Sequence, residues 1–180
     1  MATQVNVQHS SQSDAWGTPR HILAAVRDVL GPIDFDPASS PAFNTNVQAA
    51  TYFTEEQDAL TTPWPNTGTI FCNPPGGKVG NASKTALFWE LLMQHRAALG
   101  FDHAIFLAFS LEALQTTQGS KDSIGVFTFC VPRKRLAFET PEGIPGKAPS
   151  HSNAIVYVAG RINKERRFYD RFSEFGCVID

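Results

Sequence analysis

The residues of this sequence best suited to chemistry are Asn73, Pro74 and Pro75, which directly follow a short apolar segment at 69–72. Proline fixes its own φ, has no N–H and pushes the preceding residue out of helical space, so the tripeptide is stiff and extended. The Asn73 oxygen and a neighbouring main-chain carbonyl can accept both N–H bonds of an exocyclic amine. The tripeptide therefore indicates a site that holds an amine ready to attack, although taken alone it also fits an ordinary loop.

Two carboxylates also lie at or after the ends of strand candidates. Asp36 ends a short strand candidate at 33–36, and Asp58 lies in a turn region after a second candidate at 51–54. Ligands of open α/β sheets bind beyond the carboxyl ends of the strands. Because Asp36, Asp58 and Asn73 lie at or just after strand ends, we expect them on one rim of a sheet, where together they predict a binding site.

Strand and helix candidates alternate along the chain and position these residues. Thr18 and Pro19 predict the N-cap and first residue of a helix that ends at Gly31. The continuous apolar run 103–109 is typical of a strand buried on both faces. The other expected elements are a loop with a poorly marked helix at 38–50, a flexible loop at 76–81, helices at 83–99, 111–118 and 161–175, and strands at 126–131, 135–138, 153–159 and 177–179. This order predicts an α/β three-layer sandwich with a mostly parallel sheet and antiparallel strands near the C-terminus.

The composition is that of one globular domain. The chain has 180 residues, of which 42% are hydrophobic and 18% charged, so we expect a single domain over 14–180 and a disordered segment at 1–13. No apolar run reaches the ~20 residues that span a bilayer, and no segment near Met1 has the apolar stretch of a secretory signal. These features indicate a cytoplasmic protein that does not contact membranes.

The cysteines and the charges add two further expectations. Cys72, Cys130 and Cys177 have neither zinc-ligand nor disulfide spacing, so we expect free thiols and no metal site. Residues 121–180 hold ten of the fifteen Lys and Arg residues against seven of the seventeen acids, a net charge of +3 against −5 for the remainder. This asymmetry fits contact with phosphates, although a solvated surface explains it equally simply.

An ordered series of short motifs runs from Trp16 to about Gly160. Its members are Trp16-Gly-Thr-Pro19, Asp34-Phe-Asp-Pro-Ala-Ser39, Asn44, Asp58-Ala-Leu60, Trp64, Phe71-Cys-Asn-Pro-Pro75, Phe88-Trp89, Phe109-Ser110, Cys130-Val-Pro-Arg-Lys-Arg135 and Pro149-Ser-His-Ser-Asn153. In this order the motifs resemble the phage-type Dam family of DNA adenine-N6 methyltransferases. The resemblance implies a Rossmann-like fold, S-adenosylmethionine (SAM) as the cofactor and DNA as the partner.

The resemblance also implies roles for individual residues. Asn73 and the Pro74 carbonyl would accept the N–H bonds of the adenine N6 amine, with Pro75 completing the motif and the adenine flipped out of the duplex. The cofactor would be held by Thr18, Asp36, Pro37, Ala38, Ser39 and Asp58. The resemblance further implies a phage or prophage origin, action in the host cytoplasm, and a setting of DNA methylation and restriction–modification.

The sequence departs from the family pattern at residue 76. The family's usual aromatic after the second proline, which stacks on the flipped base, is Gly76 here, so either another ring such as Phe109 or Phe138 replaces it or the base is held weakly. A Gly-x-Gly cofactor motif is also missing. For DNA phosphates the candidate contacts are Lys78, Arg133, Lys134 and Arg135.

Three functions therefore stay open. The first is methylation of adenine in DNA. The second is methylation of an RNA base or a protein glutamine by the same Asn-Pro-Pro chemistry, and the third is a non-catalytic DNA-binding or regulatory protein on a methyltransferase scaffold. Gly76 is the residue that supports the third.

Overall fold

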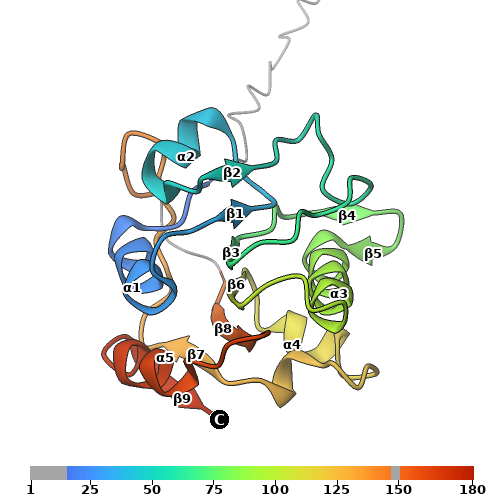
Figure 1. Cartoon of the computed structure of the whole chain (residues 1–180). Helices are drawn as coiled ribbons and strands as arrows, with labels where there is room; N and C mark the ends of the chain where they lie inside the picture. The colour runs from blue at the N-terminus through green and yellow to red at the C-terminus, as the bar shows by residue number, and fades with distance from the viewer. Residues whose placement is uncertain (1–15, 147–150) are drawn as a thin grey trace, which may run out of the picture.

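One sheet organises the molecule (Figure 1). The structure, a computed structural model, describes residues 16–146 and 151–180, so the predicted disordered segment at 1–13 lies outside it. In the described part, seven strands form a sheet in the order β2-β1-β3-β6-β8-β7-β9. They are β1 (Phe35–Asp36), β2 (Thr51–Tyr52), β3 (Thr69–Cys72), β6 (His103–Ala108), β7 (Phe129–Pro132), β8 (Ala154–Ala159) and β9 (Gly176–Ile179). The strands β2, β1, β3 and β6 are parallel, and the pairs β6–β8, β8–β7 and β7–β9 are antiparallel.

Helices cover both faces of this sheet. α1 (Arg20–Leu30), α2 (Pro41–Val47) and α5 (Glu165–Phe172) lie on one face, and α3 (Lys84–Ala97) and α4 (Glu112–Thr116) lie on the other (Figure 1). Side chains of β6 alternate between two cores: Phe106 packs with the α3 cluster, whereas Ile105 and Leu107 pack with the α1 and α5 cluster. All six residues of β6 are buried, as the apolar run predicted. The expected three-layer α/β fold is confirmed.

Several predicted local details are wrong. Pro19, not Thr18, is the N-cap of α1. The loop predicted at 76–81 contains half of a hairpin formed by β4 (Lys78–Val79) and β5 (Ala82–Ser83). The segment 135–138 forms no strand, because the Leu136 N–H donates to a side-chain oxygen instead of a strand partner.

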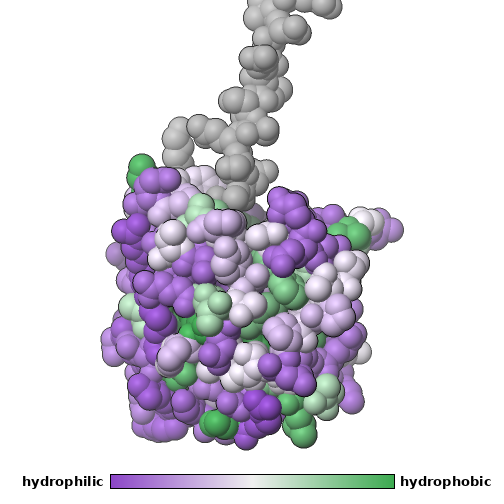
Figure 2. All heavy atoms as spheres, turned by 45° about the horizontal axis from the view of Figure 1, so that its top comes forward, coloured by the Kyte–Doolittle hydropathy of each residue, from purple (hydrophilic) through white to green (hydrophobic). Residues whose placement is uncertain are grey.

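The surface is mainly hydrophilic. Figure 2 shows small, separate hydrophobic patches on one face instead of a continuous apolar area. Within residues 16–146 and 151–180, no helix combines the length and apolar character needed to cross a membrane. Over the same residues, no group of three or more His, Cys, Asp or Glu side chains is placed to hold a metal ion. The three cysteines are free, with Cys72 and Cys130 buried.

Candidate active site

The carboxyl ends of β1, β3 and β6 meet at one edge of the sheet. Cys72 pairs with Phe106 across the parallel β3–β6 ladder, so Asn73, directly after β3, lies close to the end of β6. Asp36 is the last residue of β1, the neighbour of β3 on its other side. Phe109 follows β6 directly. The structure therefore brings these three predicted site residues to the same edge.

The N-terminus of α1 lies at the same edge of the sheet. Helix α1 ends at Leu30 and is followed after a short connection by β1, so it runs back along the sheet and starts at the carboxyl edge. Thr18 lies two residues before it. Phe71 packs with the α1 cluster, and because side chains alternate along an extended chain, Asn73 points to the same side. The site thus lies between the strand ends and the N-terminus of α1.

Asp36 is a buried carboxyl group. Its side chain is 2% exposed, and its Oδ1 accepts a hydrogen bond from the Ala38 N–H at 2.9 Å. Burial raises the pKa of Asp36 from 3.8 to about 7, and the Ala38 N–H and the nearby Ser39 hydroxyl, which is not aligned for a full hydrogen bond, oppose this rise. None of the ion pairs among the described residues involves Asp36. A buried carboxyl group of this kind suits a positively charged ligand.

Two buried hydroxyl groups lie unsatisfied in the same region. Among the described residues, the buried side-chain polar atoms without a hydrogen-bond partner are Thr18 Oγ1 and Ser39 Oγ. Their segments approach each other, because a Cβ on Gly17 would lie 2.5 Å from the ring of Phe43 in α2. Each unsatisfied buried group costs about 1–3 kcal/mol. Both belong to the predicted cofactor residues, so a polar ligand that bonds to them fits this part of the site.

The neighbours of Asp36 shape the rest of this region. Pro37 is buried, and Ala38 is half-buried against the α3 cluster. The Ser39 N–H donates to the Phe53 carbonyl at 2.9 Å, so this stretch is fixed to the segment after β2. The loop that carries the candidate cofactor contacts is therefore held by main-chain bonds.

Asp58 lies elsewhere on the rim and already has a local role. It is exposed, has a φ of 45° and accepts from the Leu60 N–H and the Thr61 hydroxyl, both at 3.1 Å. These contacts are those of a turn residue. A cofactor contact by Asp58 stays a prediction, and a test must keep the turn: Asn tolerates the left-handed region better than Ala.

The Asn-Pro-Pro tripeptide presents an uncommitted amide. Asn73 is half-buried, Pro74 is buried and Pro75 is exposed. None of the side-chain hydrogen bonds among the described residues uses the Asn73 amide, although it follows a fully buried strand. Its oxygen and NH₂ group are therefore available to a ligand, on a backbone that the two prolines make stiff.

Residue 76 offers no stacking surface, and the candidate rings lie on other segments. Gly76 is exposed, and a Cβ there would meet nothing within 4 Å. Phe109 and Phe138 contact each other with ring centroids 5.6 Å apart. His151 lies 4.8 Å from Phe109. The two phenylalanines were predicted from the sequence, whereas His151 was not; the signal that could have found it is its place in the Pro149–Asn153 motif.

The basic candidates divide into two groups. Lys78 is exposed on the β4–β5 hairpin, and Lys134 and Arg135 are exposed after β7. The Arg133 guanidinium, also exposed, donates to the carbonyls of Ser173 and Glu174, at 3.2 and 3.1 Å. Carbonyls at the C-terminal end of a helix have no partner within the helix. Arg133 supplies donors to two carbonyls just after α5 and so stabilises the end of this helix.

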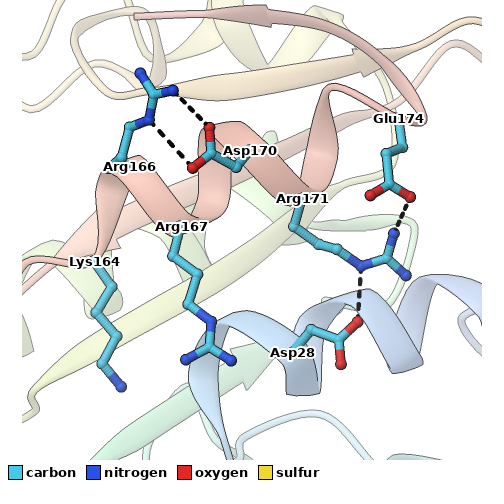
Figure 3. Close-up of a pocket in the computed structure, with 7 residues that line it drawn as sticks. All are labelled: Asp28, Lys164, Arg166, Arg167, Asp170, Arg171 and Glu174. Carbon is cyan, nitrogen blue, oxygen red and sulfur yellow. Dashed lines mark hydrogen bonds and ion pairs between the residues drawn. The ribbon is translucent and has the colours of Figure 1, made fainter.

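An open cavity lies away from this edge (Figure 3). It measures about 650 Å³ and is lined by Asp28 of α1 together with Lys164 and residues of α5. Ion pairs Arg171–Asp28, Arg171–Glu174 and Arg166–Asp170 occupy much of its lining. Asp28 belongs to the last turn of α1, whereas the candidate site lies at the first. The cavity is therefore separate from the candidate active site.

The fold and the polar strand ends define the class of protein as a Rossmann-like methyltransferase. A family model described as DNA N-6-adenine-methyltransferase (Dam) matches residues 5–97, more than half of the chain, and the chain belongs to this family. No curated protein matches the chain. The matched range contains Thr18, Asp36, Asp58 and Asn73 but ends before Phe109, Phe138 and His151.

Proposed function

We propose that this chain transfers a methyl group from SAM to the N6 amine of adenine in DNA. The observation that carries the proposal is the uncommitted amide of Asn73 at the end of β3, flanked by buried Pro74 and next to a buried carboxyl group at the end of β1. Membership of the Dam family supports DNA as the substrate. The setting, a phage or its host's cytoplasm, is part of the same proposal.

The candidate cofactor residues fit SAM. When bound, SAM supplies a methyl group on a positively charged sulfonium, which is a good leaving group. Thr18 Oγ1 and Ser39 Oγ would bond to its polar amino-acid end, and Asp36 would face a positive group of the cofactor. Asp58 would accept from the cofactor's adenine amine. This assignment gives partners to the two buried hydroxyls and stabilises the ionised form of Asp36.

Asn73 would orient the target amine. Its Oδ1 and the Pro74 carbonyl would accept both N6–H bonds, which turns the nitrogen lone pair out of the plane of the base and toward the methyl group. Preorganised acceptors in a partly desolvated site need not rearrange during the reaction, so positioning accounts for most of the rate. The adenine reaches this position only when flipped out of the duplex, where Phe109 and Phe138 offer ring surface.

DNA phosphates would be held by Lys78, Lys134 and Arg135, and we expect Arg133 to behave differently. Lys78→Gln should make the log–log dependence of DNA affinity on salt concentration shallower by ~1 and leave stability unchanged. Arg133→Gln should instead lower the unfolding temperature, because carbonyls after α5 lose their donor, and leave the slope nearly unchanged. Titrations at several salt concentrations and thermal unfolding measure both effects. An unchanged slope in Lys78→Gln would place the DNA elsewhere.

A comparison of methyl acceptors tests the proposed function. The full chain with tritiated SAM should label unmethylated plasmid DNA and leave structured RNA and a glutamine-containing peptide unlabelled. Preferential labelling of RNA or peptide would contradict the proposal. Gly76 favours one competing function, that of a non-catalytic DNA-binding protein. A protein of this kind should bind DNA without labelling it. Calorimetry would then show whether it binds SAM.

A further inference from the structure

Buried Asn153 joins two segments that each carry a ring of one cluster. Its side chain is 2% exposed. Its Nδ2 donates to the Phe109 carbonyl at 2.7 Å, and its Oδ1 accepts from the Leu136 N–H at 3.1 Å. Phe109 follows β6, and Phe138 lies two residues after Leu136 in a segment that forms no strand. The amide of one residue therefore fixes the backbones that carry both rings.

The three rings of the cluster come from three separate segments. Phe109 lies 5.6 Å from Phe138 and 4.8 Å from His151, with interplanar angles of 44° and 45°. The phenylalanines are half-buried and His151 is exposed, so part of the ring surface is accessible. A hollow of about 360 Å³ is lined by His151 and by residues of the segment that follows Phe109. Aromatic faces of this kind stack on any nucleobase.

The cluster lies at the same end of the sheet as the tripeptide that would hold the target amine. The β3–β6 register pairs Cys72 with Phe106, and continued by one residue it places Asn73 opposite Leu107. Phe109 is two residues further along, on the same side of the chain as Leu107. Neighbouring strands lie about 4.8 Å apart. The rings therefore lie at the same end of the sheet as Asn73, on the side where Phe71 and Leu107 pack, and Gly76 contributes no ring there.

We propose that Asn153 is a positioning residue that sets an aromatic site for the target base, with His151 as the third ring beside Phe109 and Phe138. The proposal rests on the proposed function, because it concerns the base whose amine Asn73 would hold. In this site, rings from three other segments take the place of the ring that is missing at residue 76. Removal of one stacking ring should weaken the hold on an extruded base roughly 5- to 150-fold.

The test compares three variants of the full chain with one control. Asn153→Asp keeps an acceptor for the Leu136 N–H but, when ionised, cannot donate to the Phe109 carbonyl. Phe109→Leu and His151→Leu each remove a ring. The control Thr69→Val breaks a similar buried clamp at the opposite edge of the sheet, where the Thr69 hydroxyl donates to the Pro32 carbonyl at 2.6 Å.

The readouts separate base binding from folding. They are the kcat and KM for unmethylated plasmid DNA, the SAM affinity, and the affinity for a duplex with adenine opposite an abasic site relative to the fully paired duplex. We expect each of the three variants to raise the KM for DNA about tenfold and to reduce the preference for unpaired adenine, with SAM affinity unchanged. Thr69→Val should lower the unfolding temperature and change neither DNA readout.

The outcomes distinguish the two proposals. Wild-type methylation of DNA with an unchanged DNA KM and preference in Phe109→Leu and His151→Leu would overturn the aromatic site and leave the proposed function standing. Alternatively, the wild type prefers unpaired adenine, Phe109→Leu removes this preference, and no protein methylates DNA. This result would support the aromatic site and contradict the proposed function. If Asn153→Asp lost SAM affinity and stability together with DNA binding, its role would be structural and the positioning role would be overturned.

Discussion

Asn73→Ala should lower the rate of methyl transfer to DNA by ~10²–10³, the usual loss when one preorganised polar contact to a reacting group is removed. The substitution deletes the acceptor that would orient the target amine and leaves both prolines in place. Because the Asn73 amide takes part in no hydrogen bond among the described residues, the fold loses nothing that depends on it. SAM affinity and the unfolding temperature should therefore stay the same.

Single-turnover rates with saturating SAM and DNA measure this effect on the chemical step. The matched control is Asn66→Ala, which makes the same change at an exposed residue before the start of β3, at the opposite edge of the sheet. It should keep the wild-type rate. Equal rates in Asn73→Ala and the wild type would contradict the assigned role of Asn73, whereas loss of SAM binding in Asn73→Ala would show that the change disturbs the cofactor pocket.

Asp36→Asn should weaken SAM binding by ~10- to 100-fold, the range for a lost hydrogen bond to a charged group. In wild-type protein the affinity should also depend on pH, since Asp36 has a pKa of about 7 without ligand and must be ionised to face a cation. Below pH 7 the wild-type affinity should fall by up to tenfold per unit, and above that pH it should level off. The variant should lack this dependence.

The stability of the unliganded protein should fall as pH rises, whereas the SAM affinity rises. The folded-state pKa of Asp36 is raised from 3.8 to about 7, so between these values the folded state binds more protons than the unfolded state. Wild-type stability therefore decreases as pH rises through this window and stays lower above it. Asp36→Asn should consequently unfold at a higher temperature than wild type at pH 8, and the difference should vanish below about pH 4.

Calorimetry across pH 5 to 8 measures the first effect and thermal unfolding the second. Asp28→Asn is the control, because Asp28 is a surface carboxylate of α1 paired with Arg171 and is far from the strand ends. Its SAM affinity should show the wild-type pH dependence. A pH-independent affinity in the wild type, together with full affinity in Asp36→Asn, would remove Asp36 from the cofactor site.

Strong local signals made the central elements predictable. The runs of β3 and β6 are apolar except for Thr69 and His103, the first residue of each strand, and they are followed by Asn73 and Phe109, to which we assign roles. Because parallel strands end at a common edge, the grouping of Asp36 and Asn73 followed from the order of elements. These predictions needed only local pattern and general topology.

Predictions failed where a distant side chain replaced a local partner. The segment 135–138 has the composition of a strand, but buried Asn153 takes the Leu136 N–H. The hydrogen bonds from Arg133 to carbonyls after α5, about 40 residues away, were likewise not predictable from its place in a basic triplet; its contact with DNA stays a prediction. The contact between His151 and Phe109 likewise joins residues far apart in the sequence. Such pairings depend on tertiary packing, which neither spacing nor composition determines.

The prediction of a flexible loop at 76–81 failed for a different reason, since part of this segment belongs to the hairpin β4–β5. Its turns use Gly77 and Gly80 at positive φ, 94° and 58°, and glycine adopts such values without steric cost. The same glycines predict a flexible loop when only composition is considered. The hairpin places Lys78 on an exposed strand beside the Asn-Pro-Pro tripeptide, a more defined position than a loop would give.

The most direct test of the central claim is the identity of the methylated nucleoside. Unmethylated plasmid DNA is incubated with SAM and either the wild-type chain or Asn73→Ala, digested to nucleosides and analysed by mass spectrometry. Our account predicts N6-methyldeoxyadenosine with the wild type and little above background with Asn73→Ala in the same time. Methylated cytosine, or DNA without any methylated base although SAM is bound, would contradict it.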